Sequence, residues 1–159
     1  MGLDATVYCT CFRDGKLKTP PPAHIDVYVD DDGSLNCRNT DLQTQIEFDA
    51  WCFDAACEHE NGDLIGHRIG NMSLVACLRS ELSRQPDDFP IILSKVVYSG
   101  THCGDHLDRK TVNAMRPELE RLSRFNAAKP EDQQWIDHFL KVMRELVDAS
   151  DQTGNPIVF

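Results

Sequence analysis

The densest group of reactive side chains lies in residues 99–106, directly after the most continuous apolar run in the chain. The group contains two imidazoles, one thiol and one carboxylate, and Gly100 and Gly104 loosen the backbone around them. Its members are His102, Cys103, Asp105 and His106. Such side chains bind metals or carry protons, so this loop is the first candidate for a functional site.

A metal site would need further ligands from elsewhere in the chain. Zinc binds three or four Cys, His or carboxylate side chains at about 2.0–2.3 Å. Cys57 and His59, at the end of a predicted helix, offer such a pair. We therefore predict that His102 and His106 converge with Cys57 or His59 on one centre that could hold zinc. The alternative is a polar loop whose side chains hydrogen-bond to their neighbours, since the sequence contains no C-x2-C pair.

Nucleophilic catalysis is a second interpretation of the same loop. Cys103 or Ser99 would attack a substrate, His102 or His106 would act as the base, and Asp105 would orient the base. Adjacent residues rarely point toward one another, so a distant histidine is a more natural partner for the thiol. The remaining candidates for this site are His59, His67, Arg68, which could hold an anionic group, and Thr101. The chain contains no nucleophile elbow, phosphate-binding loop or dinucleotide fingerprint.

Cysteine usage indicates free thiols. The count of seven is odd, and residues 1–12 lack the features of a signal peptide, so we expect a cytoplasmic protein without a disulfide framework. Cys9 and Cys11 fall on the same face of a predicted strand as Ala5 and Val7. We therefore interpret these two cysteines as small buried apolar residues, although they could form a second ligand pair.

The chain is acidic, with 26 Asp and Glu residues against 16 Lys and Arg residues and a formal net charge of −10. The negative electrostatic field of such a chain repels nucleic acids and membrane surfaces and attracts basic partners. No apolar run approaches the ~20 residues that span a bilayer. These features predict a binding protein with a basic protein partner, and no binding to nucleic acid or membrane.

The elements that must position these side chains alternate between strands and helices. Residues 91–98 predict a strand buried on both faces, because β-branched and aromatic residues dominate this short run. Further strands are predicted near residues 3–12 and 25–29, and helices near residues 41–57, 71–85, 108–125 and 130–153. A capping box at Thr40 and Gln43 and caps at Asn71 and Asp108 predict three helix starts, and Gly154 predicts the end of the last helix. The last helix has the clearest pattern, with Trp135, Phe139, Met143 and Leu146 along one stripe. The order predicts one α+β domain over residues 1–159, with a small, mostly antiparallel sheet covered by three to four helices.

Three stretches together resemble a group of small bacterial proteins of unknown function. These are the opening MGLDATVYC, the stretch CEHENGDLIGHRIGN and the stretch VVYSGTHCGDHL. The small, acidic format is also similar to that of bacterial immunity proteins, which neutralise toxins. That second resemblance concerns format alone and assigns no role to any residue.

The sequence therefore favours a small acidic binding protein that resembles immunity proteins in neutralising a basic protein partner, with a structural metal site that could hold zinc. The alternative is a small metal-dependent or Cys/His hydrolase with its site in residues 99–106.

Overall fold

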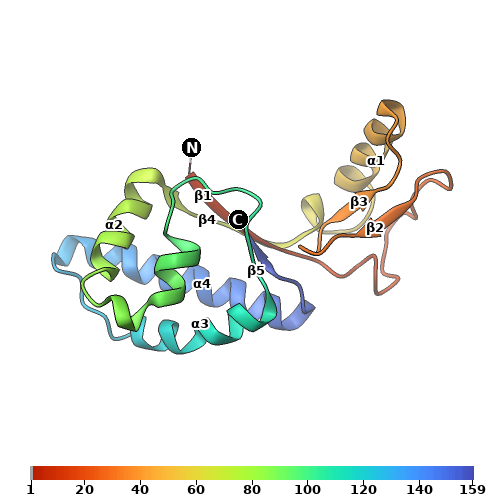
Figure 1. Ribbon diagram of the computed structural model, residues 1–159. Coiled ribbons are helices and arrows are strands. Elements are labelled where there is room, and N and C mark those ends of the chain that lie inside the picture. The colour runs from red at the N-terminus through yellow and green to blue at the C-terminus, as the bar shows by residue number, and fades with distance from the viewer. Residues whose placement is uncertain (1) are drawn as a thin grey trace.

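The computed structural model describes residues 2–159 and has an α+β fold, as the sequence predicts (Figure 1). Its main sheet has four strands in the order β4-β1-β6-β5, and its smaller sheet has two, β2 and β3. Every pairing between these strands is antiparallel. The strands are β1 (Gly2–Tyr8), β2 (Val27–Val29), β3 (Leu35–Cys37), β4 (Asp63–Asn71), β5 (His106–Leu107) and β6 (Ile157–Val158). The helices are α1 (Leu42–Asp54), α2 (Met72–Leu82), α3 (Arg109–Leu122) and α4 (Gln133–Thr153).

The two longest strands of the main sheet, β1 and β4, pair with each other along most of their length. Alternate residues of β1 point into the core, since Leu3, Ala5 and Val7 are buried while the residues between them are partly exposed. The predicted strand over residues 3–12 ends early, at Tyr8. Beyond it the chain enters a turn, in which the amide of Asp14 donates to the carbonyl of Thr10. The last residues of the predicted strand therefore lie outside the sheet.

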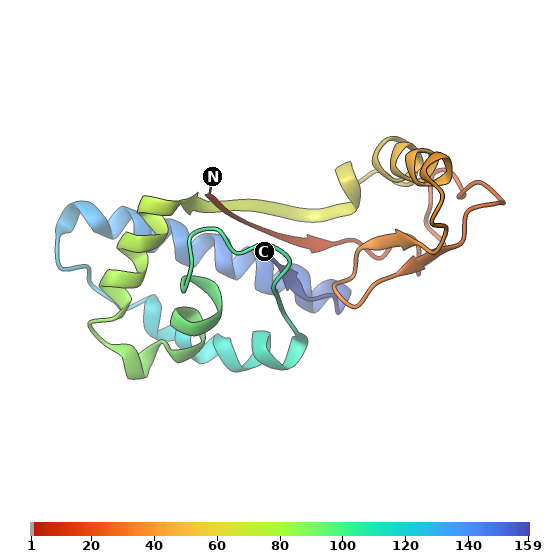
Figure 2. The ribbon, with the colours of Figure 1, turned by 45° about the horizontal axis from the view of Figure 1, so that its top comes forward.

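Helix α4 packs against β1 and β4 and supplies much of the main core (Figure 2). Phe139, Met143 and Leu146 are completely buried, so the predicted apolar stripe is confirmed at these positions. Trp135 is an exception, because 41% of its surface is exposed. It lies in the first turn of the helix. Gly154 ends the helix in a left-handed conformation, as predicted.

The predicted central strand over residues 91–98 is wrong. Ile92–Val96 form one turn of π-helix, and Ile92, Val96 and Val97 are buried at helical spacing. The buried carboxylate of Glu118 caps this turn, because its two oxygens accept the backbone N–H groups of Ile91 at 2.8 Å and Ile92 at 2.9 Å. A short apolar run fits a buried strand and a buried helical turn equally well, so its periodicity alone does not decide between them.

Side-chain caps fix the starts of three helices. Asn71 accepts the amide of Leu74, and Asp108 accepts the amide of Thr111, which confirms the two predicted caps. Helix α1 begins one residue later than the predicted capping box at Thr40, because Asp41 accepts the amide of Thr44.

Residues 9–62 form a protruding lobe between β1 and β4. Figures 1 and 2 show that β2, β3 and α1 extend away from the helices that cover the main sheet. The lobe has a small core of its own, centred on Ile25, Phe48, Trp51 and Ala56. Its chain leaves the main body after β1 and returns to it at β4, so two adjacent segments form its base.

Candidate metal centre

Two short segments at the base of the lobe carry Cys9, Cys11, Cys57 and His59. The first two residues follow β1, and the other two precede the single helical turn Glu60–Gly62 that leads into β4. Because β1 and β4 are paired, the segments that continue from them start side by side. The amide of Cys9 donates to the carbonyl of Gly62 at 2.8 Å and extends the pairing to the base of the lobe. The topology therefore brings together two pairs of side chains that lie far apart in sequence.

The buried side chain of Asn155 fixes the segment that carries Cys9 and Cys11. Its Nδ2 donates to the carbonyl of Tyr8 at 2.7 Å, and its Oδ1 accepts a hydrogen bond from the guanidinium of Arg13. Cys9 and Cys11 lie between these two anchored residues. Their backbone is thus held from both sides.

The ligand atoms of the four residues all lie within 4.8 Å of one another. The sulfurs of Cys9 and Cys57 are 3.8 Å apart, and Nδ1 of His59 lies 3.4 Å from the sulfur of Cys11 and 3.8 Å from that of Cys57. An ion with sulfur at about 2.3 Å and nitrogen at about 2.0–2.1 Å in tetrahedral geometry requires S–S separations of about 3.8 Å and S–N separations of about 3.6 Å. These three distances match this requirement, and the other pairs of ligand atoms lie within 4.8 Å, so the cluster could hold a metal ion.

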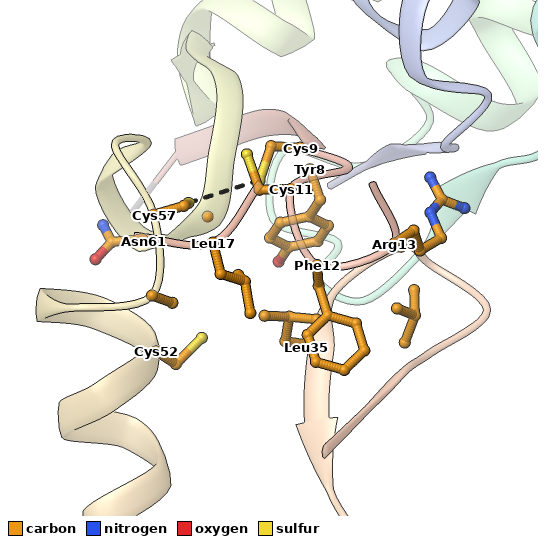
Figure 3. Close-up of a pocket in the computed structure, with 14 residues that line it drawn as sticks. Tyr8, Cys9, Cys11, Phe12, Arg13, Leu17, Leu35, Cys52, Cys57 and Asn61 are labelled. Carbon is orange, nitrogen blue, oxygen red and sulfur yellow. Dashed lines mark hydrogen bonds between the residues drawn. The ribbon is translucent and has the colours of Figure 1, made fainter. Parts of the chain in front are cut away.

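The sulfurs do not form a disulfide. A disulfide bond is about 2.05 Å long, well below the Cys9–Cys57 separation, and all seven cysteines are free. Figure 3 shows the thiols of Cys9, Cys11 and Cys57 gathered at one end of a pocket. The rest of that pocket is mostly apolar and is lined by residues such as Phe12, Leu17 and Leu35. This apolar side limits water access to a bound ion from one direction, whereas Cys9, Cys11 and His59 also line a more polar hollow with Thr10, Asp14 and Lys16.

The electrostatics of the cluster disfavour thiolates in the absence of a cation. Burial is the main cause that raises the pKa of Cys9 to about 12, and the neighbouring thiol of Cys57 contributes to the increase. Burial also raises the pKa of Cys11. A divalent cation reverses this balance because it binds the thiolate form and releases the protons.

The prediction had grouped Cys57 and His59 with the loop after residue 98, and the structure groups them with Cys9 and Cys11. These two cysteines are not buried apolar residues of a strand, as we interpreted them, because they lie beyond β1 and are partly exposed. The signal that could have found them is the matched spacing of C-x-C and C-x-H, each with one residue between its ligands.

The loop after residue 98 is held against the C-terminus and not against the lobe. The amide of Gly104 donates to the carbonyl of Phe159 at 2.7 Å, and the amide of Phe159 donates to the carbonyl of Asp105 at 2.9 Å. His106 belongs to β5 and pairs with Val158 in β6. These bonds explain why neither His102 nor His106 joins the four-residue cluster.

His102 is a buried packing residue in this arrangement. Its ring stacks on Tyr98 with centroids 4.6 Å apart and lies 4.9 Å from the ring of Phe159. Its Nε2 donates to the carbonyl of Val96 at 2.8 Å, and its Nδ1 lies 3.5 Å from an Asp105 oxygen. The hydroxyl of Tyr98 also donates to Asp105. Because Nε2 is engaged by the backbone, it cannot accept a proton from a nucleophile here.

The other candidates for catalysis are dispersed. Cys103 is exposed, and within residues 2–159 no imidazole nitrogen lies within hydrogen-bonding distance of its sulfur. Nε2 of His67 lies 2.7 Å from a carboxylate oxygen of Glu145 in α4, and the neighbour of His67 in β4, Arg68, is exposed. Ser99 accepts the amide of Thr101 within the loop. The structure thus assembles no nucleophile–base pair from these residues.

Comparisons with protein-family models, with curated proteins and with solved structures found no match for this chain. Across residues 2–159, none of the helices has the length and apolar character needed to cross a membrane.

Proposed function

We propose that this chain is a small acidic binding protein in which a structural zinc ion fixes the base of a protein-binding lobe. The observation that carries the proposal is that the ligand atoms of Cys9, Cys11, Cys57 and His59 all lie within 4.8 Å of one another. Three thiolates and one imidazole form a ligand set typical of structural zinc, and softer ligands of this kind are unsuited to magnesium or calcium. Reduced thiols also suit a reducing compartment such as the cytoplasm.

A structural role follows from the number of ligands. A catalytic zinc ion keeps one position open for water or substrate, whereas four protein ligands complete a tetrahedral shell. The ion would join the two ends of a lobe whose own core contains four buried apolar residues, with partly buried residues packed against them. Small cores of this size commonly need a metal or disulfide for stability. The hydrolase alternative in residues 99–106 has less support, because His102 packs against aromatic rings there.

The experiment is a measurement of zinc content in protein purified without a polyhistidine tag. We expect about one zinc ion per chain in the wild type and a large loss of zinc in Cys11→Ser and His59→Ala. Cys52→Ser is the matched control, because Cys52 lines the same pocket without belonging to the four-residue cluster. Wild-type protein without zinc, or equal zinc content in all four proteins, would overturn the proposal.

A further inference from the structure

One face of α1 exposes apolar residues along its whole length. Leu42, Ile46 and Phe53 are exposed to 72%, 53% and 54%. Together with Asp49 they occupy positions i, i+4, i+7 and i+11, which form a single stripe on an α-helix. Isolated exposed apolar residues are common on protein surfaces, but a stripe of three large ones on a single helix is a mark of an interaction site.

The lobe does not need this stripe for its own stability. The opposite side of α1 carries Phe48 and Trp51, which are buried in the core of the lobe. The indole of Trp51 also donates to the carbonyl of Thr19 at 3.0 Å. Helix α1 is thus anchored through one face, and its second apolar face is left toward solvent.

The lobe that carries the stripe is strongly acidic. Residues 9–62 contain eleven Asp and Glu residues against four Lys and Arg residues, so this third of the chain carries seven of the ten net negative charges. Asp49 lies within the stripe, and Asp54 ends the helix beside Phe53. Both carboxylates are exposed, and no cationic group of residues 2–159 lies within 4.0 Å of either one. They are available to a partner's basic side chains.

We infer that the stripe of Leu42, Ile46, Asp49 and Phe53 is the docking surface for a basic protein that presents apolar side chains flanked by arginine or lysine. The inference rests on the proposed binding function and assigns to it a surface and a class of partner. A second copy of the chain is a poor occupant, since two lobes of net charge −7 repel each other. Apolar anchors would supply the affinity, and the acidic surround would speed the encounter.

The test uses the full zinc-loaded chain and a synthetic probe. The probe is a labelled peptide of about five helical turns, with leucine along one face and arginine on both flanks. Its binding is followed by fluorescence anisotropy. We expect saturable binding that Phe53→Ser and Ile46→Ser each weaken at least about tenfold. Asp49→Lys should slow association and reduce its dependence on salt.

Two controls match these variants at a distance from the stripe. Trp135→Ser removes an aromatic side chain of similar exposure from α4, and Glu131→Lys makes the same change of charge outside the lobe. Both should change the affinity less than about twofold. Equal binding of a scrambled peptide, or a Phe53→Ser variant that binds like the wild type, would overturn the inference.

Two further outcomes would assign the stripe to another occupant, and each would also overturn the inference of a basic protein partner. One is self-association of the chain that Phe53→Ser abolishes. The other is adsorption of the chain to zwitterionic vesicles that the same substitution abolishes. Zinc content is measured on every sample, so failure of the docking surface is distinguished from failure of the zinc site.

Discussion

Glu118 shows at the scale of one residue how a buried charge fixes a local structure. Both of its oxygens accept backbone N–H groups from the turn at Ile91 and Ile92. In Glu118→Ala these donors lose their partners in a buried position, where each unsatisfied group costs about 1–3 kcal/mol. We expect the free energy of unfolding, measured by urea titration, to fall by roughly 2–4 kcal/mol. Glu118→Gln keeps one acceptor oxygen, so its free energy of unfolding should fall less. An unchanged free energy of unfolding in Glu118→Ala would contradict this role.

Glu81 provides a pH-dependent contribution to stability. The backbone N–H of Ala128 is the main cause that lowers the pKa of Glu81, and the guanidinium of Arg84 adds to the effect. Both groups donate to Oε2, at 2.8 Å and 2.7 Å. Because the folded pKa lies below the unfolded value of about 4.3, the contribution is complete well above that pH. It is lost as the pH falls through the folded pKa.

The measurement is the difference in unfolding free energy between wild type and Glu81→Gln across pH. We expect the variant to be less stable by roughly 1–2 kcal/mol at pH 7, on the scale of one charge-assisted hydrogen bond. That difference should shrink as the pH drops below about 4. Glu131→Gln, an exposed control, should show almost no difference at either pH. A gap that stays constant down to low pH would contradict the role of the ionised carboxylate.

Helix α4 provides a prediction at the scale of one element. Phe139 is completely buried between this helix and the sheet, so Phe139→Ala should cost roughly 3–5 kcal/mol of unfolding free energy. Trp135→Ala, on the half-exposed first turn of the same helix, should cost much less. Thermal unfolding of both variants compares the two positions directly. Similar losses would mean that the helix packs in a different register.

Local sequence patterns are enough to predict some of the helices but not every turn or strand end. Helices α2, α3 and α4 follow from apolar stripes bounded by Asn71, Asp108 and Gly154, because caps and periodicity are local properties. The turn at residues 92–96 did not follow from its sequence, since Glu118, a distant residue, determines it. The early end of β1 likewise depends on a turn outside the sheet.

The candidate site could be predicted only in part, for a related reason. The type and spacing of Cys57 and His59 predict that they are candidate ligands, but the identity of their partners depends on strand pairing. Pairing of β1 with β4 places Cys9 beside Gly62, whereas pairing of β5 with β6 holds His102 and His106 elsewhere. A single sequence does not specify which strands become neighbours, so the sequence predicts a second ligand pair in the loop after residue 98, whereas the structure brings Cys9 and Cys11 to Cys57 and His59.

Removal of zinc should affect the two parts of the molecule differently. The lobe has the smaller core and is joined to the main body at the proposed metal centre. We expect a chelator to increase amide hydrogen exchange strongly across residues 12–56, while α2, α3 and α4 keep their protection. Hydrogen-exchange mass spectrometry with and without the chelator makes this comparison. Uniform loss of protection, or none, would contradict a zinc ion that acts locally on the lobe.

The central claim is that one zinc ion is bound by three sulfurs and one nitrogen at the base of the lobe. X-ray absorption at the zinc edge of the wild-type protein, purified without a tag, measures this shell directly. The claim predicts three sulfur ligands at about 2.3 Å and one nitrogen ligand at about 2.0–2.1 Å. A shell composed of nitrogen and oxygen alone, or one with two imidazoles as His102 and His106 would provide, would contradict it.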